Sequence, residues 1–369
     1  MGSARIVLGG LLAFLAACGG SVDTAGSSDP VALPSRPAEQ GVYTPPADPG
    51  LEHVADGLGA PSAIAITSDA VLFTTRSTML GGELVAAGGL FVASKRAGTP
   101  LMLTVDHQGA TYETLVTDGT TAFVATSDAR VLAVPVAGGP ARVVATLEAS
   151  AVAITVNGDY VYFATDAGAL ARVAKKGGAS EPLATITGAV RGLQADDAAV
   201  YVATGAGEET AAGIVRVALD GKVTTLASSA EPCAMIRDGR SLYWTNVAAA
   251  TTASAQGKGE ILRLALDGAG SAATVASGSF SACAIAADRD NLYFATTLPD
   301  ALPLRAHGGG GGGGAASTSG IGLMRAPIAG GEPVAVAQAS RALAQPGAVA
   351  VDATHLYWLT ETAVLRLRK

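Results

Sequence analysis

Charge is scarce in this chain of 369 residues, and its scarcity excludes several classes of protein. Charged residues make up 15% of the sequence, well below the usual quarter, which argues against long charge-laced helices and coiled coils. Acidic residues outnumber basic ones by 31 to 24 and no basic run occurs, so we expect no nucleic-acid partner. The 47 glycines and 17 prolines indicate many turns instead.

The motifs of several common catalytic and cofactor sites are also missing. The sequence has four histidines, at His53, His107, His307 and His355. None of them belongs to an HExxH motif, no CxxC pair occurs, and no GxSxG elbow indicates a serine hydrolase. The glycine run 308–314 lacks the lysine and the hydroxyl residue of a phosphate-binding loop. We therefore expect no metal ion and no cofactor.

The first seventeen residues have the layout of a secretory signal peptide. Arg5 is the only charge before an apolar stretch from Ile6 to Ala17, and the stretch ends in small residues. This stretch is too short to span a bilayer, which needs about 20 apolar residues. We therefore predict a signal peptide over residues 1–17.

The end of this segment resembles the processing site of bacterial lipoproteins. Leu15-Ala16-Ala17-Cys18 matches the lipobox of that family, and Gly19 continues it. The resemblance implies cleavage between Ala17 and Cys18, and lipid on the Cys18 thiol and on its new amino group. In Gram-negative lipoproteins an aspartate after the cysteine favours the inner membrane, so Gly19 implies an outer-membrane anchor, periplasmic or surface-facing. The alternative is a plain signal peptide whose cysteine is incidental.

Residues 18–50 then form a segment dominated by glycine, serine, proline and alanine. Such a composition cannot bury a hydrophobic core. We predict that it is a flexible tether behind the lipidated Cys18, with a reach of roughly 30 Å.

Beyond residue 51 an aromatic triplet recurs seven times. The middle residues of the triplets are Leu72, Phe123, Tyr162, Tyr201, Tyr243, Tyr293 and Tyr357. Their spacing fits a unit of about 39 residues with insertions, and a turn-forming residue lies five positions before each of them. These turn residues are Thr67, Asp118, Asn157, Asp196, Asp238, Asp288 and Asp352. Each unit has the pattern of four short strands joined by three reversals.

Four-stranded units of this length in series predict an all-β fold, a seven-bladed β-propeller over residues 51–369. Six or eight blades are the alternatives. The seventh unit stops at Lys369, just after its third strand, and therefore lacks an outer strand. The segment 52–56 resembles an outer strand, so we predict that it completes the last blade and removes an exposed edge.

One repeat resembles a known propeller family more closely than the others. Leu242-Tyr243-Trp244-Thr245, followed by the segment 261–268, is similar to the YWTD repeat and to bacterial repeats of the NHL kind. The likeness covers nearly all of residues 51–369. Asn246 stands where the family has aspartate, and seven repeats occur where YWTD propellers have six blades.

The repeated aromatic and arginine positions have a structural interpretation. Eleven of the 17 aromatic residues lie in the triplets, including Trp244 and Trp358, and we expect them to pack between adjacent blades. Arginines recur at one register, which favours repeated structural hydrogen bonds over a localised anion site. These arginines are Arg172, Arg216, Arg263, Arg325 and Arg366.

Two cysteines occupy equivalent positions in neighbouring units. Cys233 and Cys283 each lie ten residues before the tyrosine of their triplet. Oxidising conditions in the cell envelope permit a disulfide, which needs Cα atoms within about 7 Å. Equivalent residues in a ring point in the same rotational sense, however, so two separate buried thiols are the other interpretation.

Insertions between the second and third strands are the best indication of function. They cover 76–88, 205–212, 247–259 and 297–320. Loops that vary on a rigid scaffold often carry binding sites, so we expect a protein or ligand partner at the loops 76–88, 247–259 and 297–320. Length drift in a surface without function is the competing interpretation.

Binding is the function that the sequence favours over catalysis. The alternative is a propeller enzyme, such as a lyase, a lactonase or a quinone-dependent dehydrogenase, with its site at the mouth of the central pore. Enzymes of these kinds gather polar residues at the starts of their innermost strands. Only Glu113 and Arg191 carry charge at those positions here, which leaves few groups for catalysis.

Overall fold

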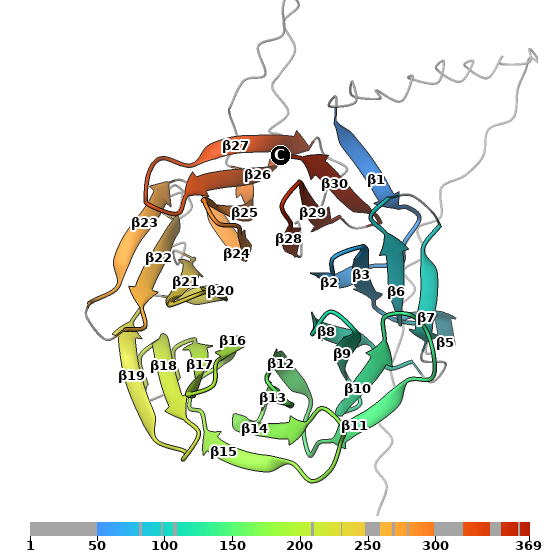
Figure 1. Ribbon diagram of the computed structural model, residues 1–369, viewed down its shortest axis with the longest axis horizontal. Helices are drawn as coiled ribbons and strands as arrows, with labels where there is room; N and C mark the ends of the chain where they lie inside the picture. Colours follow the sequence, from blue (N-terminus) through green and yellow to red (C-terminus); the bar gives the residue numbers. More distant parts are fainter. Residues whose placement is uncertain are drawn as a thin grey trace, which may run out of the picture. The chain divides into compact units, whose positions relative to one another are not determined.

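The chain forms a ring of antiparallel sheets in the computed structural model shown in Figure 1. The structure describes residues 50–80, 83–96, 99–105, 109–207, 210–229, 231–247, 259–267, 270–278, 280–298, 320–339, 348–360 and 362–369. In these residues no helix is long and apolar enough to cross a membrane. Seven sheets of four strands surround a common centre, with the first strand of each sheet innermost (Figure 1). The predicted seven-bladed propeller is therefore confirmed.

The strands of each blade follow one another outward from the centre. Blade 1 contains β2 (Pro61–Ile66), β3 (Ala70–Thr75), β6 (Gly89–Ser94) and β7 (Leu101–Val105). Blade 2 contains β8 (Tyr112–Thr117), β9 (Thr121–Thr126), β10 (Arg130–Pro135) and β11 (Arg142–Thr146). Blade 3 contains β12 (Ala151–Asn157), β13 (Tyr160–Thr165), β14 (Ala169–Ala174) and β15 (Glu181–Thr185).

The remaining blades repeat this order. Blade 4 contains β16 (Val190–Ala195), β17 (Ala199–Thr204), β18 (Gly213–Ala218) and β19 (Val223–Ser228). Blade 5 contains β20 (Pro232–Asp238), β21 (Ser241–Asn246), β22 (Gly259–Ala265) and β23 (Ala273–Gly278). Blade 6 contains β24 (Ser281–Ala287), β25 (Asn291–Leu298), β26 (Gly320–Pro327) and β27 (Val334–Ala339).

Blade 7 joins the two ends of the propeller, as the sequence predicts. It contains β28 (Val349–Val351), β29 (His355–Leu359), β30 (Val364–Arg368) and, as its outer strand, β1 (Leu51–Ala55). Leu51 pairs with Leu367, and the Arg366 Nε donates a hydrogen bond of 2.9 Å to the Glu52 carboxylate. Because β1 covers the edge of β30, the ring closes without leaving that strand unpaired.

The hydrophobic core lies between blades. Trp244 is fully buried, and its cluster combines Tyr201 of blade 4 with Leu264 of blade 5. Trp358 packs in a cluster that joins Tyr293 of blade 6 to blade 7. We call the interface between two neighbouring blades a seam. Large aromatic side chains in these seams supply most of the apolar area that holds neighbouring sheets together. The expected core role of the triplets is confirmed.

The two ends of the propeller carry different connections. One end, which we call the turn face, holds the turns from first to second and from third to fourth strands. The other end, the loop face, holds the connections from second to third strands and the links between blades. The turns at Asp118 and Asp352 belong to the turn face, and the connections 127–129 and 147–150 belong to the loop face.

A repeated aspartate organises the turn face. One Asp352 oxygen accepts backbone hydrogen bonds from Thr354 and His355, at 2.7 and 2.8 Å. Its other oxygen accepts the Tyr357 hydroxyl at 3.0 Å and the Lys95 Nζ of blade 1 at 2.7 Å. A single carboxylate therefore closes its own turn, binds a buried tyrosine of its own blade and clasps the next blade.

The same contacts recur around the ring. Asp288 accepts hydrogen bonds from Tyr293 and from Lys369 of blade 7, and Asp118 accepts one of 2.9 Å from Lys175 of blade 3. Burial by itself would raise the pKa of Asp118, but the Lys175 ammonium and two backbone N–H groups lower it to about 2. Burial raises the pKa of Tyr293 to about 12, assisted by its bond to the Asp288 carboxylate.

The recurrent arginines make structural contacts, mostly within the blades in which they lie, and Arg366 also donates to the Lys95 carbonyl of blade 1. Each pairs across the sheet with the tyrosine of its triplet, as Arg172 does with Tyr162 and Arg366 with Tyr357. Arg172 also binds Glu181 of the outer strand at 2.8 Å. These contacts agree with the structural interpretation of the arginine register.

Candidate functional site

The candidate site is the inner rim of the loop face, where each innermost strand begins. In six blades this strand contains a β-bulge that leaves one residue without a partner on the second strand. The unpaired residues are Ser62, Glu113, Val152, Arg191, Cys233 and Cys283. They occupy the strand-start positions that the sequence indicated for the pore mouth. A bulge bends the strand and changes the direction of its side chain, so each blade presents one residue differently from the regular pleat.

Threonines of the second strand stabilise some of these bulges. The Thr74 hydroxyl accepts the Ala63 N–H at 3.1 Å, and the Thr245 hydroxyl accepts the Ala234 N–H at 3.2 Å. Both threonines are fully buried. A buried hydroxyl thus replaces the ladder bond that the bulge removes, which keeps the bulged backbone satisfied.

Bulge residues of neighbouring blades lie close enough to bridge the seam between them. The Ser62 hydroxyl donates a hydrogen bond of 2.8 Å to the Tyr112 carbonyl of blade 2. Cys233 and Cys283 form a disulfide between blades 5 and 6, with a Cα–Cα distance of 4.9 Å. The first strands converge at the centre of the ring, and this convergence brings equivalent residues within disulfide reach.

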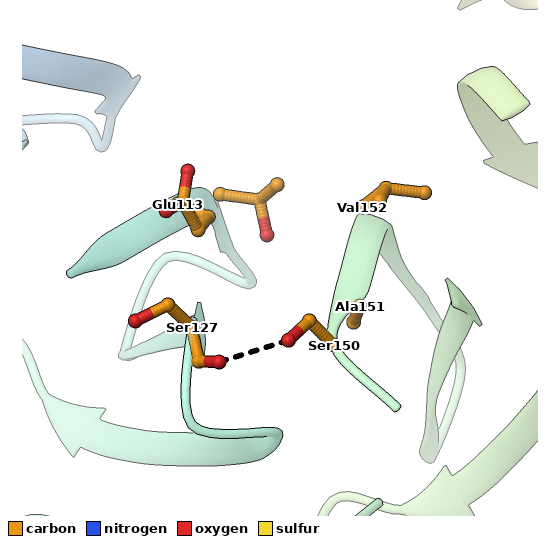
Figure 2. A pocket seen from close by; sticks show the side chains of 6 residues that line it. Glu113, Ser127, Ser150, Ala151 and Val152 are labelled. Atoms are coloured by element: carbon orange, nitrogen blue, oxygen red, sulfur yellow. Dashed lines mark hydrogen bonds between the residues drawn. The ribbon is translucent and has the colours of Figure 1, made fainter. Parts of the chain in front are cut away.

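The seam between blades 2 and 3 holds an open pocket at its rim. Its volume is about 360 Å³. The lining residues are Glu113, Thr114, Ser127, Ser150, Ala151 and Val152. Figure 2 shows Glu113 and Val152 at the two sides of this pocket, with the Ser127–Ser150 contact closing its base. In that contact the Ser150 hydroxyl donates to the Ser127 carbonyl at 2.8 Å.

Two polar side chains that can accept further hydrogen bonds line this pocket. One oxygen of Glu113 accepts a hydrogen bond from the Thr111 hydroxyl. The Thr114 Oγ1 is buried and has no hydrogen-bond partner among the described residues. Buried polar atoms are normally paired, so an unpaired hydroxyl at a cavity wall indicates a place for a ligand or water.

The acidic side chain next to this wall is held ionised. Burial alone would raise the pKa of Asp128, but hydrogen bonds from Arg130 and from the Thr126 hydroxyl lower it. Arg130 binds the Asp128 carboxylate at 2.6 Å. The pair therefore leaves no net charge of its own beside the pocket.

The two charged residues predicted at the pore mouth do not come together. Glu113 lies on blade 2 and Arg191 on blade 4, so blade 3 separates them. No ion pair links them, and Arg191 is exposed with no hydrogen-bond partner in the part of the chain that the structure describes. The expected polar residues thus lie on one rim without forming an acid–base pair.

Sequence reasoning missed part of the site. Ser127 and Ser150 lie in connections between strands, and Thr114 follows the bulge, where no motif distinguishes them from other small polar residues. Their approach depends on how far two sheets diverge in space, which no spacing along the chain records. Another missed network joins the Trp244 Nε1 to the Ser229 hydroxyl at 2.9 Å, and Ser229 to Asn246 at 2.6 Å.

The predicted loops are described only in part. All four insertions lie between second and third strands, as expected. In 76–88 the chain forms a small hairpin, β4 (Thr78–Leu80) with β5 (Glu83–Ala86), where the sequence indicated only a loop. Most of 247–259 and of 297–320 lies outside the described residues, as do Ala17, Cys18 and the tether.

Comparisons with known proteins bear on the architecture. No family model and no curated protein matches this sequence. YCF48 bound to D1 peptide is similar in structure, with a TM-score of 0.59, 11% identity, and coverage of 86% of this chain and 96% of that one. YCF48 from Cyanidioschyzon merolae gives a TM-score of 0.58 at 10% identity, over 86% and 98% of the two chains. A chain of the mitotic checkpoint complex gives 0.60 at 11% identity, over 89% and 98%. At such low identity these likenesses establish the propeller fold.

Proposed function

We propose that this protein is a lipoprotein of the cell envelope, held on the outer membrane through Cys18, whose propeller binds a protein partner at the loop face. The anchor is supported by the sequence around Cys18 and by the tether composition of residues 18–50. The binding role is carried by one observation, the open pocket on the rim of the loop face. Pockets with a few polar groups in an apolar wall are typical binding sites.

The similar structures support a protein as the partner. YCF48 was seen bound to the D1 peptide, and another similar propeller is a chain of the mitotic checkpoint complex. The YWTD-like and NHL-like character of the blade at Tyr243 is compatible with such a scaffold. We assign the partner site to the loop face because rigid scaffolds commonly display binding residues on their loops.

Lipid attachment can be tested by metabolic labelling with an alkyne-bearing fatty acid. We expect label on the full chain, recovery of that chain in the outer-membrane fraction, and loss of both in Cys18→Ala. Cys233→Ala serves as a control because it also removes a cysteine. Label that persists in Cys18→Ala would contradict the anchor.

The binding face can be tested by site-specific photocross-linking in the cells that make the protein. A benzophenone amino acid replaces Val152 on the loop-face rim, or Val223 on the outer strand of blade 4. These valines have similar exposed fractions, 42% and 48%, so accessibility is matched. We expect a covalent adduct with a second protein from position 152 and none from 223. Equal adducts from both positions, or none from 152, would contradict the proposal.

A further inference from the structure

We propose that the pocket between blades 2 and 3 binds a basic side chain of the partner, a lysine ammonium on its aliphatic stem. This inference rests on the proposed protein-binding function and names the chemistry of one contact. The pocket combines the three features that such a side chain needs, which are a carboxylate, a hydroxyl acceptor and an apolar wall.

The pocket has apolar surface on one side and polar groups on the other. Val152 is 42% exposed and lines the pocket, so its methyl groups offer apolar surface to methylene groups. Across the pocket, Glu113 offers a carboxylate of which one oxygen is engaged by Thr111. The buried Thr114 Oγ1 has a free acceptor site among the described residues. An ammonium group has three donors, which matches these acceptors.

Charge around the pocket favours a cation over an anion. Glu113 is the only charged side chain that lines this pocket within the described part of the chain. Its carboxylate is bound by the Thr111 hydroxyl and has no basic partner among the described residues. The Arg130 side chain is already bound to Asp128. An incoming anion would therefore face uncompensated negative charge, and an incoming cation would neutralise it.

At three other seams a side chain of an innermost strand forms a bridge to the neighbouring blade. The Ser62 hydroxyl bridges blades 1 and 2, and the disulfide bridges blades 5 and 6. The Gln194 side chain bridges blades 4 and 5 through the Met235 carbonyl at 3.2 Å. At the seam of blades 2 and 3 the Ser150–Ser127 hydrogen bond joins the connecting segments, but Glu113 lies opposite Val152, whose side chain cannot accept or donate a hydrogen bond. The Glu113 carboxylate therefore stays open to the pocket.

Saturation-transfer difference NMR on the detergent-solubilised full chain tests this assignment. The probes are Nα-acetyl-lysine N-methylamide, the norleucine analogue with the same stem but no charge, and cadaverine as a free diamine. The variant is Glu113→Gln, which keeps the shape and removes the charge. Glu231→Gln is the matched control, since Glu231 lies on the loop face next to blade 5.

We expect the lysine probe to bind more tightly than the norleucine probe, with a dissociation constant that rises about tenfold in Glu113→Gln. Glu231→Gln should change it less than about twofold. Equal binding of the lysine and norleucine probes, or no effect of Glu113→Gln, would overturn the proposal. Binding of cadaverine without the lysine probe would overturn the assignment to a protein side chain.

The outcome of the NMR experiment can be distinguished from that of the photocross-linking experiment, which tests the proposed function. Adducts at Val152 with no charge-dependent binding of the lysine probe would retain the partner and remove the basic contact. Charge-dependent binding of the probe with no adduct at Val152 would retain the pocket chemistry and remove the protein partner.

Discussion

The turn face and the loop face of this propeller are built from the same repeats, yet their polar groups are used differently. On the turn face Asp118, Asp288 and Asp352 each bind a lysine of the next blade. On the loop face Arg191 is exposed, and Glu113 borders an open pocket. The comparison shows that the polar groups of the turn face stabilise the ring. Those of the loop face are left free to form hydrogen bonds with a partner.

Comparison of the repeats shows in which blades the turn-face clasp, the contact between a turn aspartate and a lysine of the next blade, is formed. The lysine always follows the third strand, where its N–H binds the first turn of its own blade, as for Lys175 and the Asp159 carbonyl. Val136 holds the same position in blade 2, whose preceding blade has Thr67 instead of aspartate. Each of the three lysines at this position follows a blade with a turn aspartate, but Leu266 and Ile328 occupy it after Asp196 and Asp238, so an aspartate is not always matched by a lysine.

The largest expected loss of stability comes from the loop face, because the Cys233–Cys283 disulfide there joins two blades covalently. In this respect the loop face departs from the contrast with the turn face. Cys233 and Cys283 are separated by 50 residues along the chain. In the chain-entropy treatment, replacing both with alanine lowers the free energy of unfolding by about 4 kcal/mol. Urea unfolding of the oxidised protein and of the double variant measures this loss. A loss below about 1 kcal/mol would show that the bridge adds little to the ring.

The next largest loss of stability is expected from Asp352 on the turn face, and it tests whether the turn aspartates stabilise the ring. Asp352→Ala removes five hydrogen bonds and leaves Lys95 largely buried without its carboxylate partner, so we expect a loss of about 2–4 kcal/mol. Asp69→Ala, at an exposed aspartate in the equivalent turn of blade 1, should cost less than about 0.5 kcal/mol. Equal losses in the two variants would refute the clasp.

Acid titration tests the same clasp with a smaller effect. The pKa of Asp118 is about 2 in the folded protein and about 3.9 in an unfolded chain. The carboxylate therefore contributes stability above pH 4, and that contribution disappears as the pH falls toward 2. We expect Asp118→Asn to be less stable than the parent by about 2 kcal/mol at pH 7. Between pH 4 and pH 2 the difference should vanish, and a constant difference would contradict the assignment.

The smallest expected effect is on the loop face. Glu113→Gln should change the free energy of unfolding by less than about 0.5 kcal/mol, because Glu113 has no basic partner within the described residues. Thermal unfolding beside Asp118→Asn measures the contrast. A loss as large as that of Asp118→Asn would mean that Glu113 belongs to the structural framework.

The sequence predicted the architecture because each blade repeats its own signals. The triplet at Tyr357, the turn aspartate Asp352 and the missing outer strand after Lys369 were enough to predict the blades and their closure. The bulges were harder to predict, because no residue type indicates that Glu113 lacks a paired residue on β9. The pocket could not be predicted, because it depends on the distance between two sheets.

The disulfide illustrates the same limit in a different way. Spacing along the chain correctly placed Cys233 and Cys283 at equivalent positions, but the ring argument left separate thiols open. The bulges at both residues changed the directions of their side chains, and the convergence of β20 and β24 brought the Cα atoms to 4.9 Å. Side-chain direction at an irregular backbone position is what sequence periodicity cannot supply.

The difference between the two faces is tested most directly by measuring stability and partner cross-linking on the same four variants. Two variants alter the turn face, Asp118→Asn and Asp352→Asn, and two alter the pocket on the loop face, Glu113→Gln and Thr114→Val. With the photoreactive residue at Val152, the account predicts that turn-face variants lose unfolding free energy and keep their adduct yield while folded. Loop-face variants should keep their stability and lose adduct. Folded turn-face variants with reduced adduct, or loop-face variants with unchanged adduct, would contradict the division of roles.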